Sequence, residues 1–235
     1  MSREYGTGQP RLVIEASTPH ASVAVVTSGE VLAEAEAAMR PGADDALMPA
    51  VARALDAAGV RPADLDAVVC GAGPGGFTSL RIAAAVAKGI AHATGCRLEA
   101  VPSLALAAAG EGPGAWVVTL DALRGERYVA RVTVDGLGYA FEYDYLGVLG
   151  AAGLADAVGQ ADAGPWKVGA LDANVRPPRA RAVIGCAQLV QEVPLDAWEP
   201  VYGRLAEAQA RWEQAHGRPL ASALDGGAEG DTAGQ

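Results

Sequence analysis

The sequence is short of histidine and cysteine, with three of each among its 235 residues. No two histidines are spaced as in H-E-x-x-H or H-x-x-x-H, so we expect neither a histidine-based metal site nor the positioned histidine that a protease triad needs. The cysteines Cys70, Cys96 and Cys186 are odd in number and form no C-x-x-C pair. This pattern favours free thiols in a reducing compartment over a disulfide framework or a zinc site.

Positive charge is also scarce, since 18 Lys and Arg residues face 28 Asp and Glu residues, for a net charge of −10. Such a chain binds a phosphate backbone or an anionic membrane poorly by itself, so contact with RNA would need a partner that supplies positive surface. The first ten residues lack the apolar stretch of a signal peptide. No segment approaches the roughly 20 apolar residues of a membrane span. We therefore expect a cytoplasmic protein that does not associate with membranes.

The most informative segment is CGAGPGGFTSLRIAAAVAKGIA, residues 70–91. An apolar strand at residues 65–70 runs into four glycines and a proline, and Thr78 or Ser79 is expected to cap the helix that follows. A glycine loop between a strand and a helix can aim free N–H groups at an anion. It is equally what a tight strand-to-helix crossing requires, because glycine tolerates positive φ. We favour this structural interpretation.

Two kinds of nucleotide site can be compared with this segment. Gly71, Gly73 and Gly76 satisfy G-x-G-x-x-G, and Glu99 lies about twenty residues further on, where a ribose-binding acid would stand. The lysine and threonine of a P-loop do not follow the loop, which excludes that motif. A Rossmann-type oxidoreductase stays a minority interpretation, because the elements before the loop have a different order.

The order of predicted elements indicates the fold. It consists of strands at residues 12–14, 22–26 and 31–37, a helix at 43–58, the strand at 65–70, the helix after the loop, a strand at 98–101 and a short helix at 103–109. A Rossmann fold opens with its glycine turn after the first strand. The order here is that of actin-like ATPases. We expect an α/β protein of the actin-like ATPase (ribonuclease H-like) fold, with two lobes and mixed sheets flanked by helices.

The chain divides into four predicted regions: a flexible N-terminus at residues 1–10, a first lobe at 11–110, a second lobe at 111–220 and a disordered tail at 221–235. The second lobe should hold strands at 116–121, 127–134 and 139–145, and helices at 183–190 and 205–216. Between Leu146 and Arg181, glycine, alanine and proline dominate, and the pattern predicts little.

Four motifs occur in order between residue 12 and about residue 204. A strand ends in Glu15-Ala16-Ser17-Thr18, residues 73–82 read GPGGFTSLRI, residues 121–128 read DALRGERY, and Pro200, Tyr202 and Arg204 form P-x-Y-x-R. These resemble the D-T-S-T, G-P-G-S-F-T-G-L-R-I, D-A-R-x-x-E-V-Y and P-x-Y-x-R motifs of the bacterial TsaB (YeaZ) family. Asp121 and Glu126 could pair as acid and base, but they flank a predicted hairpin turn, where carboxylates are common.

The resemblance implies a non-catalytic subunit of the system that attaches threonylcarbamoyl to the adenosine beside the anticodon of certain tRNAs. Members of the family pair with the catalytic paralogue TsaD, work with the ATPase TsaE and form homodimers in isolation. It implies no cofactor or metal, and contact with tRNA only within the complex. The main rival is an actin-fold ATPase or small-molecule kinase that uses Glu15 and the glycine loop.

Two departures from the family pattern weaken autonomous ATP chemistry. Glu15 stands where the family has aspartate, and its extra methylene places the carboxylate about 1.5 Å further out. The first helix lacks the family's histidine-containing opening and begins Ala43-Asp44-Asp45. The residues left as a possible vestigial nucleotide loop are Glu15, Ser17, Thr18, Gly73, Gly75, Gly76 and Thr78.

The resemblance also implies a partner surface on the first two helices. In the second helix, Ile82, Val86 and Ile90 are predicted to cover the sheet, which leaves a stripe of small residues on the opposite face. The residues expected to meet the partner are Leu47, Met48, Val51, Leu80, Ala84, Ala87, Lys88 and Ala91.

Overall fold

The computed structural model describes residues 8–39, 46–109, 113–162, 166–172, 177–203 and 216. The chain falls into one unit that ends at Gly203 and a second that begins at Arg204. Almost all of the second unit lies outside the described residues, so the fold below is that of the first.

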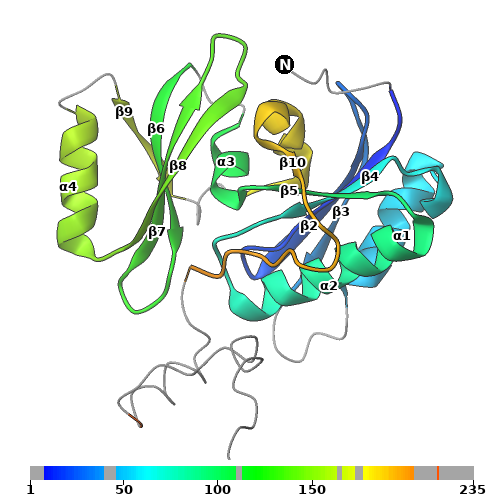
Figure 1. The fold of residues 1–235 in the computed structure, drawn as a ribbon. Helices are drawn as coiled ribbons and strands as arrows, with labels where there is room; N and C mark the ends of the chain where they lie inside the picture. Colours follow the sequence, from blue (N-terminus) through cyan, green and yellow to red (C-terminus); the bar gives the residue numbers. More distant parts are fainter. Residues whose placement is uncertain are drawn as a thin grey trace, which may run out of the picture. The chain divides into compact units, whose positions relative to one another are not determined.

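The larger sheet has six strands in the order β10-β5-β4-β1-β2-β3 (Figure 1). The strands β1, β2 and β3 form an antiparallel meander, β4 pairs parallel to β1, and β5 pairs parallel to β4. The strands are β1 (Arg11–Glu15), β2 (His20–Val26), β3 (Val31–Ala38), β4 (Ala67–Gly71), β5 (Arg97–Val101) and β10 (Gln191–Glu192).

The second sheet has four strands in the order β8-β7-β6-β9. Three of them form an antiparallel set, and the fourth lies parallel to β6. They are β6 (Gly114–Asp121), β7 (Arg127–Val134), β8 (Ala140–Leu149) and β9 (Trp166–Asp172). The helix α4 (Ala151–Asp162) packs on this sheet, where Leu154 meets Val117 and Val129.

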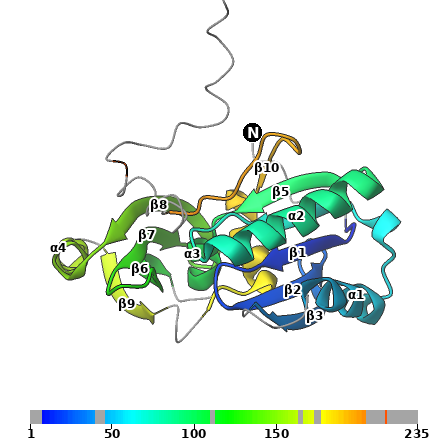
Figure 2. The ribbon, with the colours of Figure 1, turned by 90° about the horizontal axis from the view of Figure 1, so that it is seen from below.

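Helices cover both faces of the larger sheet because the strand residues alternate between two cores. Leu12 and Ile14 point toward α1 (Leu47–Ala58) and α2 (Phe77–Thr94), which lie over the same face (Figure 2). Val13 points the other way, into a core shared with the second sheet. The helix α3 (Ser103–Ala108) and the 3-10 segment η2 (Ala180–Leu189) fill the space between the sheets. A shorter 3-10 helix, η1 (Pro62–Asp64), lies between α1 and β4. The predicted α/β class and element order are confirmed.

The residues of α2 are arranged differently from the prediction. The helix begins at Phe77 with Gly76 as its N-cap, and neither predicted cap residue acts as one, since the Ser79 hydroxyl donates back to the Gly76 carbonyl oxygen. The predicted sheet-facing side is correct only in part, since Val86 and Ile90 are partly buried against the core beneath the helix but Ile82 is not. Ala83, Ala87 and Ala91 pack on the sheet, whereas Ile82 is 39% exposed. Small side chains let the helix approach the strands closely, and the larger isoleucine is left outside.

The second lobe departs further from the sequence pattern. The segment predicted as a helix at residues 183–190 is a run of 3-10 turns with a kink at Cys186. After it, β10 joins the larger sheet beside β5, so this part of the predicted second lobe (111–220) belongs structurally to the first sheet. Neither α4 nor β9 was predicted. The opening of the first helix at 43–45, the helix at 205–216 apart from its last residue, and the tail at 221–235 lie outside the described residues.

Candidate functional site

The glycine loop links β4 to α2, and three other elements converge on it. Glu15 comes from the end of β1, Ser17 from the turn after β1, and Ser103 from the first residue of α3. All three are buried. The parallel pairing of β1 with β4 brings the ends of these strands together, which is why residues far apart in sequence meet here.

Both carboxylate oxygens of Glu15 are engaged by the protein. Oε1 accepts the backbone N–H of Ser17 at 2.6 Å, and Oε2 accepts the hydroxyl of Ser103 at 2.7 Å. A Cβ at Gly71 would lie 2.0 Å from Oε2, so only glycine leaves room for this carboxylate. The Glu15 carboxylate therefore ties β1 to α3.

Three N–H groups of the loop are likewise used internally. Ala72 donates to the carbonyl oxygen of Val101 at 2.8 Å, Gly73 to the Ser103 hydroxyl at 3.0 Å and Gly76 to the carbonyl oxygen of Ser17 at 2.9 Å. A phosphate cradle would aim such donors at the ligand. The favoured structural interpretation of the glycines agrees with this geometry.

Of the other residues in the predicted vestigial nucleotide loop, some lie at the glycine loop and some do not. Gly75 is packed against Ser17, since a Cβ there would lie 2.4 Å from the Ser17 carbonyl oxygen. The hydroxyl of Thr18 is turned to the backbone of His20 in a local turn. Thr78 is exposed on the first turn of α2. Thus Glu15, Ser17, Gly73, Gly75 and Gly76 are brought together, while Thr18 and Thr78 are not.

The buried carboxyl group of Glu15 should make the stability of the chain depend on pH. Burial raises the pKa of the Glu15 carboxyl, and the hydrogen bonds from Ser17 and Ser103 oppose the rise. A raised folded-state pKa means that this group's contribution to stability is full below the ordinary pKa of glutamate and is lost as pH rises through the folded-state pKa. Glu15→Gln removes the titration and keeps the size. We expect its stability relative to the unmodified chain to increase as the pH rises above about 4, measured by urea unfolding. A difference independent of pH would contradict the assignment.

The sequence did not predict that residues 200–203 contact the glycine loop. Val201 donates its backbone N–H to the carbonyl oxygen of Ala72 at 2.8 Å, and the ring of Tyr202 lies 4.6 Å from that of Phe77. The P-x-Y-x-R motif marked this segment, but sequence spacing alone could not place it on the loop.

The predicted partner residues are mostly inside the chain. Six of the eight, namely Leu47, Val51, Leu80, Ala84, Ala87 and Ala91, are buried, so the outward stripe predicted from them is wrong. Met48 is 44% exposed and Lys88 is partly exposed. In contrast, the large apolar residue Ile82 on α2 is exposed to solvent.

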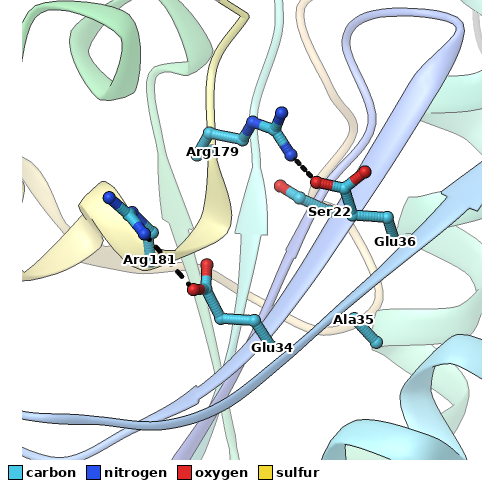
Figure 3. Close-up of a pocket in the computed structure, with 6 residues that line it drawn as sticks. All are labelled: Ser22, Glu34, Ala35, Glu36, Arg179 and Arg181. Atoms are coloured by element: carbon cyan, nitrogen blue, oxygen red, sulfur yellow. Dashed lines mark hydrogen bonds and ion pairs between the residues drawn. The ribbon is translucent and has the colours of Figure 1, made fainter.

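A pocket of about 580 Å³ lies away from the loop, where β3 meets the start of η2 (Figure 3). Arg179 pairs with Glu36, and Arg181 pairs with Glu34 at 3.4 Å. The hydroxyl of Ser22 accepts the N–H of Ala180 at 2.8 Å. Because the charges that line the pocket pair with one another, it is best explained as a polar junction that fixes η2 on the sheet.

Other residues singled out from the sequence have structural partners. Glu99, at the position of a ribose-binding acid, is buried and forms ion pairs with Arg11 at 3.0 Å and Arg97 at 2.9 Å. Asp121 accepts the N–H of Leu123 at 2.8 Å in the hairpin turn. Cys70 and Cys186 are buried, and burial raises the pKa of the Cys186 thiol to about 12.

Within residues 8–39, 46–109, 113–162, 166–172, 177–203 and 216, no group of three His, Cys, Asp or Glu side chains is placed to hold a metal ion. Over the same ranges, no helix has the length and hydropathy required to cross a bilayer.

Comparison with known sequences gives partial matches. Residues 43–150 match the family described as TsaD, tRNA N6-adenosine threonylcarbamoyltransferase. An uncharacterized protein from Mycobacterium tuberculosis is 39% identical over 128 residues, which cover 54% of this chain and 60% of that protein. The tRNA threonylcarbamoyladenosine biosynthesis protein TsaB from Escherichia coli is 31% identical over 131 residues, which cover 54% of this chain and 56% of TsaB. The chain thus spans less than two thirds of the length of these curated relatives.

Comparison with solved structures gives longer matches. A crystal structure from Pseudomonas aeruginosa, described as an uncharacterized protein with similarity to the peptidase YeaZ, has a TM-score of 0.64 and 26% identity, and the match covers 83% of this chain and 100% of that chain. YeaZ from the same organism has a TM-score of 0.63 and 24% identity, with coverage of 83% and 99%. These likenesses confirm the fold that the motifs and the element order predicted.

Proposed function

We propose that this chain, which has a YeaZ/TsaB-like, actin-like ATPase fold, is a non-catalytic subunit of the machinery that forms threonylcarbamoyladenosine in tRNA. The observation that carries the proposal is the likeness to the Pseudomonas aeruginosa YeaZ-like structure over the whole of that chain. The similarity to Escherichia coli TsaB and the match to the TsaD family support the same pathway.

The geometry of the glycine loop supports a non-catalytic role. In this chain, the carboxylate that would face a metal or phosphate is held by Ser17 and Ser103 instead. Three loop donors are bonded to the protein itself. The loop thus acts as a structural crossing that fixes α2, and α2 is one of the two helices proposed to meet a partner.

The proposed principal partner is a TsaD-family protein, the catalytic paralogue, with the TsaE ATPase joining during the reaction cycle. The contact surface consists of the outward sides of α1 and α2, which we call the helical face: Met48, Ala52, Ile82, Ala85, Lys88 and Gly89, all at least partly exposed. Met48 and Ile82 supply its apolar contacts. In the absence of that partner, a second copy of the chain takes the same face and forms a homodimer.

The acidic composition supports the remaining features of the proposal. With a net charge of −10, the chain by itself has little attraction for tRNA, so tRNA is held by the assembled complex in the cytoplasm. The chain takes no cofactor of its own in this role.

Depletion of the protein in its own cells tests the proposed function. We expect threonylcarbamoyladenosine in bulk tRNA to fall on depletion and to recover with the unmodified chain, measured by mass spectrometry of digested tRNA. The purified chain should hydrolyse ATP no faster than buffer. Unchanged tRNA modification would exclude the pathway, and ATP turnover that is lost in Glu15→Ala would favour the actin-fold ATPase or kinase.

A further inference from the structure

We propose that residues 200–203 form an internal lid on the glycine loop, and that the hydroxyl of Tyr128 fastens this lid from the second sheet. We call residues 200–203 the strap. The inference rests on the geometry around the loop and does not depend on the pathway proposed above. It assigns to Tyr128 the task of tying the loop and the strap to the second sheet.

The strap is bonded to the loop through its backbone. The N–H of Val201 donates to the carbonyl oxygen of Ala72 at 2.8 Å. On the other side of the same residue, the Val201 carbonyl oxygen lies 2.4 Å from where a Cβ of Gly73 would be. Gly73 also has a φ of +82°, which other residues rarely adopt. The strap therefore lies in direct backbone contact with the loop, and glycine at position 73 makes this contact possible.

Aromatic packing continues the contact onto α2. The ring of Tyr202 lies 4.6 Å from the ring of Phe77, the first residue of the helix, with the two planes at 45°. The guanidinium of Arg81, one turn further on, lies 5.3 Å from the Phe77 ring centre. Because aromatic pairs at this separation attract one another, the strap is anchored at the beginning of α2.

Tyr128 reaches this contact from β7 of the second sheet. Its hydroxyl lies 3.4 Å from the carbonyl oxygen of Gly75 and 3.3 Å from that of Tyr202, so one donor is shared between the loop and the strap. Gly203 fits beside the ring because it has no side chain: a Cβ there would lie 2.5 Å from Tyr128 Cε1. The φ of Gly203 is +68°, which likewise favours glycine.

These contacts connect the larger sheet, the strap and the second sheet at one point. In Figure 1, the orange strap runs past the start of α2 toward the second sheet, as these contacts require. Since the Tyr128 hydroxyl links β7 to both other parts, its removal should loosen the strap and the loop and leave the interior of the larger sheet unchanged. A side chain that only fills space would not produce this local pattern.

The chain offers a matched control for Tyr128→Phe. Tyr145 lies on the neighbouring strand β8, and its hydroxyl is buried without a hydrogen-bond partner among the described residues. Tyr145→Phe therefore removes the same atom from the same region and breaks no bond. Any difference between the two variants reports the hydrogen bonds of Tyr128.

Amide hydrogen exchange by NMR tests the proposal. In Tyr128→Phe, we expect the amides of Val201 and Gly76 to exchange about fivefold faster, as for the loss of one ordinary hydrogen bond. The amides of β1 should be unchanged, and Tyr145→Phe should leave all of them within about twofold of the unmodified chain. Unchanged exchange at Val201 and Gly76 in Tyr128→Phe, or an equal acceleration throughout the larger sheet, would overturn the proposal.

Discussion

Ala87→Arg is expected to unfold the chain, whereas Ile82→Arg should leave it folded and abolish its association with partners. The two residues lie on the same helix, α2, and differ in which side they occupy. Ala87 is fully buried against the sheet, so an arginine there overfills the core and buries an unpaired charge, at a cost of about 3 to 5 kcal/mol for the charge alone. That is a large part of the roughly 5 to 15 kcal/mol that stabilises a typical domain.

Ile82 is 39% exposed, and an arginine can extend from it into water without disturbing the core. If the helical face binds a partner, the same arginine must be buried there, and a loss of about 3 kcal/mol weakens binding by about two orders of magnitude. Circular dichroism with urea unfolding measures the fold, and light scattering measures dimerisation. Unfolding by Ile82→Arg, or normal assembly of that variant, would contradict the arrangement of α2 or the choice of its partner face.

Gly75→Ala should be strongly destabilising, because the loop has no room for the added methyl group. The added Cβ would lie 2.4 Å from the Ser17 carbonyl oxygen and 2.6 Å from Ser17 Cα, which are backbone atoms that cannot rotate away. Movement of Ser17 would also break the bond from the Gly76 N–H to that carbonyl oxygen. Overpacking and the lost bond together should reduce the free energy of unfolding by about 3 kcal/mol, which corresponds to about 6 to 12 °C in Tm.

Gly159→Ala is the matched control, because it adds the same methyl group in the exposed interior of α4, away from the helical face, where nothing lies within 4 Å of the new atom. Alanine is the better helix former, so this variant should gain about 0.5 to 1 kcal/mol. Thermal unfolding of both variants checks the pair. Equal effects of the two substitutions would show that the loop is not packed as described.

The elements of the first lobe could be predicted because each carries a local signal. Strands β1 and β2 are apolar runs, β3 alternates apolar residues with glutamate, and the glycines at 59 and 95 end α1 and α2 in the left-handed conformation. In contrast, α4 and β9 lie in a segment dominated by alanine and glycine, where apolar periodicity is weak. Neither the strand order nor the return of β10 to the larger sheet has a local signal, since both depend on pairing between distant residues.

The orientation of α2 could not be predicted for a different reason. The helix is apolar on several sides, so periodicity does not determine which side meets the sheet. Weight given to the large Ile82 misplaced that residue, whereas close packing put the small Ala83, Ala87 and Ala91 against the sheet, with Val86 and Ile90 partly buried beside them. At the glycine loop, the sequence identified the residues but not their partners. The bond from Ser103 to Glu15 joins residues 88 positions apart, and the strap comes from still further along the chain.

The central claim is that the chain acts through the helical face as the partner of a TsaD-family protein. The most direct measurement is co-purification from its own cells of the tagged chain and of its Ile82→Arg variant, with the associated proteins identified by mass spectrometry. We expect a TsaD-family protein to accompany the unmodified chain in near-equal amount and to be absent with the variant. Recovery of that protein with both, or with neither, would contradict the claim.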